Sequence, residues 1–219
     1  MHLDGLQGIV ESTKNRDSVL NLECELCLIG LVAYFEAFWK DHFASLINIF
    51  PPLLRNLRES GHETAIDATD LLMFEETPLA RLGFLIAERC DLGTARKINR
   101  AFMGLLRVSP FGRDDAERFD KLLNDRNLLV HHGGIYTSRY VQHVRKRIAS
   151  EEIYFQSLEV TPQDFQEAAS FAERIARKAL NATHAALLGL VASQNVRLSK
   201  QRREAIKSTL WFPFVPDTA

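Results

Sequence analysis

Cysteine is scarce in this chain, with three residues in 219. Cys24, Cys27 and Cys90 stand in apolar surroundings and are too few for the disulfide framework of a small secreted domain. Their scarcity favours a reducing compartment, and we expect a cytoplasmic protein. Cys24 and Cys27 have redox-motif spacing, but they fall inside an expected helix, where packing in the core is the favoured interpretation.

An excess of charge of one sign is also lacking, because 27 basic and 28 acidic residues leave a net charge of −1. Nucleic acid would therefore have to be bound by local basic clusters. The segment Met1–Arg16 has no basic stretch followed by an apolar run, so we expect no secretory signal. The most apolar window, 26–38, contains Glu36 and predicts a buried helix. We therefore expect no membrane partner.

Alternating β-patterns are nearly absent, whereas apolar residues at steps of three and four recur along the chain. The hydrophobic content of 46% is ample for a core. We predict an all-α protein, a single-domain up-and-down bundle of four to five main helices, with one short extended segment near 153–160. We divide the chain into an N-terminal segment (1–16), the bundle (17–194) and a basic and aromatic C-terminal tail (195–219).

Helix boundaries are marked by caps and prolines. The long apolar pattern from Asp17 to Phe50 predicts one helix of about thirty residues, which Pro51 and Pro52 stop. A capping pattern at Thr161 and Pro162 predicts the start of a long alanine-rich helix. Further helices are expected at 53–60, from 77 onward, at 94–108 and at 113–133, and a short helix or turn is expected at 65–74.

The densest group of reactive side chains comprises Arg126, Asn127 and His131, in a run that we expect to end a helix at Gly133 and Gly134. An arginine fork can grip phosphate oxygens, an amide can orient a hydroxyl or a water, and an imidazole can move a proton near neutral pH. A plainer interpretation stays open, because basic residues are favoured in the last turn of any helix.

Helix geometry splays this group within one chain. Asn127 and His131 are four residues apart and share a face, but Arg126 and His131 are five apart and point about 140° away from each other on an ideal helix. Two copies of the motif helix that pack across a two-fold axis could instead form a composite groove with two arginines and two histidines.

The signature of the HEPN superfamily is an arginine, a polar residue, three variable positions and a histidine, and this chain resembles it from Arg126 to His131. The glycines that follow extend the resemblance, which covers roughly Leu20 to Leu190. Membership would imply a homodimeric bundle of four or five helices with the motif at the interface. Many members are metal-independent endoribonucleases that act as toxins or antiviral effectors, whereas others are inactive binding modules.

The chemistry that this resemblance implies is cleavage of single-stranded RNA by its own 2′-hydroxyl. His131 would move the proton, Arg126 would clamp the phosphate and Asn127 would orient a partner group. The sequence has no set of histidines and carboxylates at metal-ligand spacing, so we expect no metal and no cofactor. An antitoxin or a defence-system protein is a possible partner. The alternative function is an inactive HEPN homodimer that binds nucleotide, RNA or a protein.

Weaker candidates surround the motif. His132 is either a solvated cap or a second proton carrier, and Glu36 is either an exposed helix residue or a buried acid that supports the motif. Gly133 stands where some toxin relatives carry a tyrosine that is modified, so modification of that kind is not expected here. The chain after the motif is basic and aromatic, and RNA contacts there could involve Arg139, Tyr140, Arg145, Lys146 and Arg147.

Overall fold

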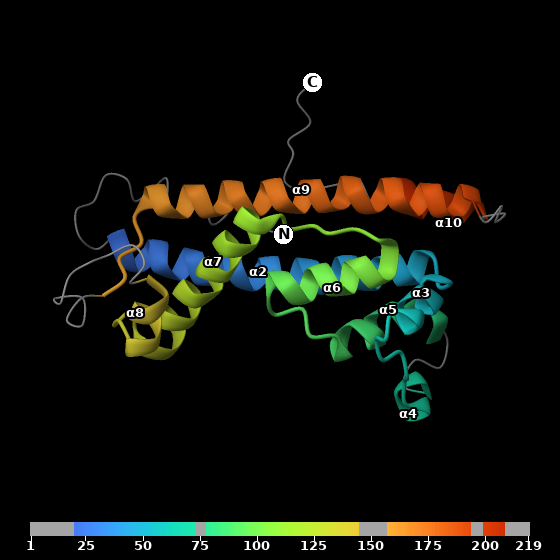
Figure 1. The fold of residues 1–219 in the computed structure, drawn as a ribbon, viewed down its shortest axis with the longest axis horizontal. Helices are drawn as coiled ribbons and strands as arrows, with labels where there is room; N and C mark the ends of the chain where they lie inside the picture. Colours follow the sequence, from blue (N-terminus) through green and yellow to red (C-terminus); the bar gives the residue numbers. More distant parts are fainter. Residues whose placement is uncertain (1–19, 73–77, 145–156, 194–198, 209–219) are drawn as a thin grey trace, which may run out of the picture. The chain divides into compact units, whose positions relative to one another are not determined.

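The structure is a computed structural model that describes residues 20–72, 78–144, 157–193 and 199–208. Nine helices fill most of these ranges (Figure 1). In chain order they are α2 (Leu20–Ile49), α3 (Leu53–Glu59), α4 (Ala68–Leu72), α5 (Pro78–Arg89), α6 (Ala95–Leu106), α7 (Arg113–His132), α8 (Ser138–Val144), α9 (Pro162–Ser193) and α10 (Lys200–Ser208). Five of them have twelve or more residues. The predicted all-α bundle is confirmed.

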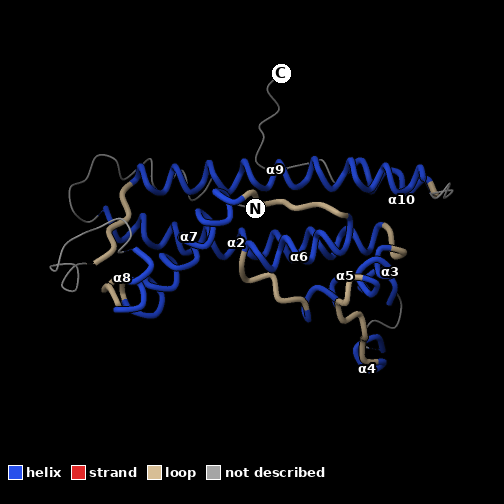
Figure 2. The backbone as a smooth tube through the Cα atoms, viewed as in Figure 1, coloured by secondary structure: helices blue, strands red, loops and turns tan. Residues whose placement is uncertain are grey.

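No strand occurs in the described ranges, as the tube in Figure 2 shows. The one extended pairing described there is an isolated antiparallel bridge between Ile135 and Ser157. The expected extended segment near 153–160 is described only from 157 onward, where the chain is not helical. The N-terminal segment 1–16 and most of the tail lie outside the described residues, so the predicted division of the chain stays a prediction.

Contacts divide the chain into two compact units. The first comprises Met1–Phe35 and Glu117–Glu173, and the second comprises Glu36–Ala116 and Arg174–Ala219. Helices α2, α7 and α9 each contribute residues to both units. Each unit has its own buried residues, and each is described by itself.

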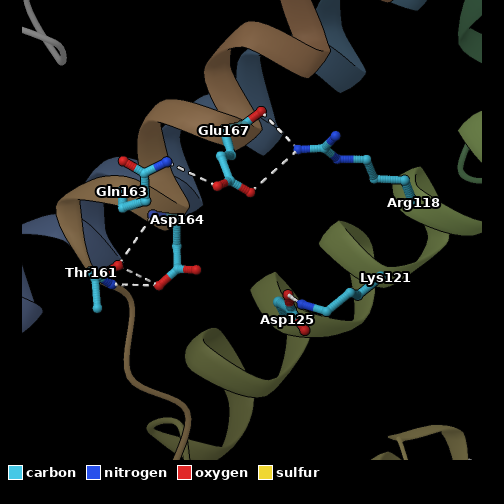
Figure 3. Close-up of polar contacts among 7 residues, drawn as sticks. All are labelled: Arg118, Lys121, Asp125, Thr161, Gln163, Asp164 and Glu167. Atoms are coloured by element: carbon cyan, nitrogen blue, oxygen red, sulfur yellow. Dashed lines mark hydrogen bonds and ion pairs between the residues drawn. The ribbon is translucent and has the colours of Figure 1, made fainter. Parts of the chain in front are cut away.

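Aromatic and aliphatic side chains hold the first unit together. Phe35 of α2 meets Phe119 of α7 edge to face, with ring centroids 5.3 Å apart. Arg118 links α7 to α9, because its guanidinium lies 5.0 Å from the Phe171 ring centroid and donates to the Glu167 carbonyl at 3.1 Å (Figure 3).

Cys24 is 0% exposed and Cys27 is 3% exposed, and burial raises the pKa of both thiols. Their predicted place in the core is confirmed.

The start of α9 is built as the sequence predicts. The Thr161 backbone N–H donates to Asp164 Oδ2 at 2.9 Å, and the Asp164 N–H donates to Thr161 Oγ1 at 3.2 Å (Figure 3). This reciprocal pair satisfies backbone donors that a helix start leaves without partners. Pro162 occupies the first helical position, where its missing N–H removes no helical hydrogen bond.

A buried histidine organises the core of the second unit. His42 of α2 is 6% exposed, and its ring stacks on Phe38 and Phe102, with both centroid distances at 5.6 Å. Its Nε2 lies 2.9 Å from Thr183 Oγ1 on α9, and that hydroxyl donates its single hydrogen to the Ala179 carbonyl. With the Thr183 hydrogen on that carbonyl, the matching tautomer of His42 donates its Nε2–H to Thr183 Oγ1. Burial lowers the pKa of His42 to about 4, so the ring is neutral near pH 7.

Candidate functional site

The predicted motif occupies the C-terminal end of α7, which ends at His132. Gly133 and Gly134 follow with φ values of +57° and +81°, a left-handed conformation that glycine adopts without steric strain. Their N–H groups donate to the carbonyls of Leu129 and Leu128, both at 3.2 Å. The helix end expected near Gly133 is confirmed.

The chain beyond this cap is tied back to the segment that precedes α9. The Leu158 N–H donates to the Gly134 carbonyl at 2.9 Å, next to the bridge between Ile135 and Ser157. A Cβ on Gly134 would lie 3.4 Å from the Leu158 carbonyl oxygen, an ordinary van der Waals contact, so the left-handed φ and not a lack of space favours glycine here. The motif therefore sits at a helix end that is held by backbone hydrogen bonds on both sides of the turn.

The motif side chains differ in exposure. Asn127, His131 and His132 are exposed, whereas Arg126 is half-buried and its Nε atom is buried. Leu128 and Leu129 between them are buried and anchor this part of α7. An exposed imidazole and amide can receive a ligand directly. The half-buried guanidinium is less free to reorient, which suits a fixed phosphate clamp more than a mobile one.

Asp125, the residue before the motif arginine, is a buried carboxylate that the sequence did not single out. It is 3% exposed, and its oxygens accept hydrogen bonds from Lys121 Nζ and from the Tyr140 hydroxyl, the latter at 2.7 Å. Figure 3 shows the Lys121 contact one turn earlier on α7. The spacing of four residues between Lys121 and Asp125 is the sequence signal that could have marked this carboxylate as paired.

Tyr140 of α8 has a different environment from the one expected of an RNA contact. It is 8% exposed, and its ring stacks on Tyr136 with centroids 5.1 Å apart. Burial, together with the Asp125 carboxylate, raises the pKa of Tyr140, so the phenol keeps its proton and donates it to Asp125. A ring in the core is not open to base stacking, and in the structure Tyr140 supports Asp125 instead.

The remaining predicted residues are distributed as follows. Arg139 is exposed on α8, whereas Arg145, Lys146 and Arg147 lie outside the described residues. Glu36 is half-buried on α2 and belongs to the second unit, whereas the motif belongs to the first. The support that Glu36 was expected to give the motif stays a prediction.

No group of three or more histidine, cysteine, aspartate or glutamate side chains in the described ranges is arranged to hold a metal ion. Within the same ranges, no helix combines the length and apolar character that crossing a bilayer requires. Comparisons with protein-family models, with curated proteins and with solved structures give no match. A proposal about function therefore depends on the α7 terminus itself.

Proposed function

We propose that this protein is a metal-independent endoribonuclease that cleaves single-stranded RNA, and that two copies of the chain form its site. The observation that carries the proposal is the end of α7, where exposed Asn127 and His131 follow half-buried Arg126 on a helix terminus fixed by two left-handed glycines. These are the three groups that phosphodiester cleavage by an internal nucleophile needs. The resemblance of the same residues to the HEPN signature supports the same reaction.

The reaction needs no group beyond these side chains and the substrate. The imidazole of His131 removes the proton from the RNA 2′-hydroxyl, and the 2′-oxygen forms a bond to the adjacent phosphorus. Arg126 stabilises the negative charge that develops on the phosphorane oxygens, and Asn127 orients the attacking hydroxyl. The bond from phosphorus to the 5′-oxygen then breaks, and that oxygen takes a proton from the His131 imidazolium that the first step formed. The products are a 2′,3′-cyclic phosphate and a 5′-hydroxyl.

Two copies solve a geometric difficulty of the single chain. Arg126 and His131 point about 140° apart on an ideal helix, so one copy does not direct both groups at one phosphate. A two-fold axis beside α7 would set the arginine of one copy against the histidine of the other. Val130 is 47% exposed and Ile135 is 62% exposed, and they flank His131 with apolar surface that a second copy would cover.

In the cell we infer a toxin or phage-defence effector that acts in the cytoplasm, where an antitoxin or a defence-system partner restrains it. His132 is a reserve proton carrier beside His131. Position 133 is a glycine, so restraint by modification of a tyrosine two residues after the motif histidine is not part of this proposal.

The decisive assay is cleavage of labelled single-stranded RNA by the purified protein in EDTA. Wild type should give fragments that end in a 2′,3′-cyclic phosphate, and His131→Ala should abolish them. His184→Ala, which removes a half-buried histidine of the second unit, is the matched control and should cleave at the wild-type rate. Equal cleavage by His131→Ala and wild type would overturn the proposal. Binding of RNA by wild type without cleavage would favour the inactive binding module.

A further inference from the structure

The second unit carries a cationic surface on two helices that lie side by side, α3 and α6 (Figure 1). Asn56 Nδ2 of α3 donates to the Leu105 carbonyl of α6 at 3.0 Å, and Ser60 Oγ just after α3 donates to the Gly104 carbonyl at 3.3 Å. The two helices and the C-cap residue of α6 carry five exposed arginines, which we name the arginine surface: Arg55, Arg58, Arg96, Arg100 and Arg107.

These five arginines have no acidic partner among the described residues, whereas other basic residues of the same unit do. Lys97 forms an ion pair with Asp91, and Arg89 forms one with Asp70. Asp115 forms ion pairs with both Arg174 and Lys178. Helix α6 contains no acidic residue, and α3 contains one, Glu59. Arg96, Arg100 and Arg107 recur at steps of four and seven residues, which places them along one face of α6 and its C-cap. In a chain of net charge −1, this face carries positive charge that ion pairs within the described residues do not neutralise.

Arg107 adds an independent observation, because it holds a strained backbone conformation. It caps α6 with φ +60° and ψ +31°, and it is the one non-glycine residue with positive φ in the described part of the chain. At the end of α7 the left-handed position is occupied by Gly133, which avoids this strain. Glycine would hold this conformation without the strain, and the arginine instead adds an exposed cation at the end of α6.

We propose that the arginine surface binds the phosphate backbone of RNA without reading its bases. Arginine forks match phosphate oxygens, and neutralising several phosphates releases counterions. The amide groups nearest the surface are already engaged, Asn56 with Leu105 and Asn99 with the backbone of Phe111. Phosphate contacts without amide contacts to bases hold a strand but do not select its sequence. This RNA is the substrate only if the proposed function holds, but its binding does not require cleavage.

Binding is measured by fluorescence anisotropy of labelled single-stranded RNA over a series of salt concentrations, with His131→Ala as background so that no cleavage occurs. The added triple variant Arg96→Gln, Arg100→Gln and Arg107→Gln should weaken binding by on the order of tenfold or more, and should flatten the salt dependence by about 0.7 in logarithmic slope for each arginine removed. The control triple, Lys200→Gln, Arg202→Gln and Arg203→Gln, removes the same charge from exposed residues of α10 and should change both quantities little.

The proposal that the arginine surface binds RNA would be overturned if both triple variants lost the same RNA affinity. It would also be overturned if the first triple variant kept the same salt dependence of binding. Arg107→Gly guards against a folding artefact, since it relieves the strained conformation and should raise the melting temperature while it weakens RNA binding. Unchanged RNA affinity in that variant would count against the role of Arg107. If the wild-type chain binds RNA through this surface but does not cleave it, the nuclease proposal fails alone. If the first triple variant binds RNA as strongly as its His131→Ala background does, and the same three substitutions in the wild-type chain leave cleavage unchanged, only the arginine-surface proposal fails.

Discussion

The Tyr140 hydroxyl donates a hydrogen bond to Asp125 Oδ1 at 2.7 Å, which joins α8 to the residue directly before the motif arginine. Asp125 is buried, and its other oxygen forms an ion pair with Lys121, one turn earlier on α7. A buried carboxylate is stable only when its oxygens are satisfied. The environment of the motif helix end therefore depends on a residue that follows the two-glycine turn.

The Tyr140→Phe variant tests this dependence. It leaves the ring in place but removes the donor to a buried carboxylate, so the free energy of unfolding should fall by about 1–3 kcal/mol. Urea denaturation measures the change. Tyr136→Phe is the matched control, because Tyr136 stacks on the same ring without bonding to Asp125, and it should lose clearly less. Equal losses in the two variants would remove the special role of the Tyr140 hydroxyl.

The buried His42 predicts a pH dependence of stability. Its pKa is lowered from 6.5 to about 4 in the folded chain by burial, so the unfolded chain binds a proton more readily. Stability from the neutral ring is fully present above pH 6.5 and is lost as pH falls from about 6.5 to about 4, with a total change of about 3 kcal/mol. Denaturation curves collected across this pH range measure that loss.

The control for this prediction is His42→Gln, which keeps a side-chain donor toward Thr183 but does not titrate. Carboxylates such as Asp115, whose pKa is lowered by Arg174 and Lys178 against an opposing effect of burial, also contribute to acid instability in both proteins. The difference between wild type and variant isolates the histidine. A pH dependence that is the same in both would show that His42 is not the responsible group.

Arg107→Gly should stabilise the chain, because glycine adopts the left-handed conformation that costs another residue about 1 kcal/mol. The expected gain in free energy of unfolding is therefore about 1 kcal/mol. Arg107→Ala removes the same side chain but keeps the strained Cβ, and it should show no such gain. A gain of similar size in both variants would attribute the effect to the arginine side chain and not to backbone strain.

Local signals in the sequence predicted much of the fold. The capping pattern at Thr161, the glycines that end α7 and the prolines after α2 act within a few residues, and each boundary lies where the pattern puts it. Of the short helix or turn expected at 65–74, α4 covers Ala68–Leu72, residues 65–67 are not helical, and residues 73 and 74 lie outside the described residues.

Contacts between residues that are far apart in the sequence could not be predicted in the same way. Asp125 reads as an ordinary solvated acid on a helix, and its burial follows only when the turn at Gly133 and Gly134 returns Tyr140 toward α7. The arginine surface also combines two helices that are joined by a hydrogen bond from the Asn56 amide to a backbone carbonyl. A contact of this kind leaves no periodic trace in the sequence.

The central claim is that each chain supplies half of a ribonuclease site, and a mixing experiment tests it most directly. Arg126→Ala and His131→Ala should each be inactive on single-stranded RNA in EDTA, because each removes one half from both sites of a homodimer. When the two variants are unfolded together and refolded, mixed dimers should regain one intact site, with about a quarter of the wild-type rate in a statistical mixture. A mixture no more active than either variant alone, beside an active wild type, would contradict a site shared between chains.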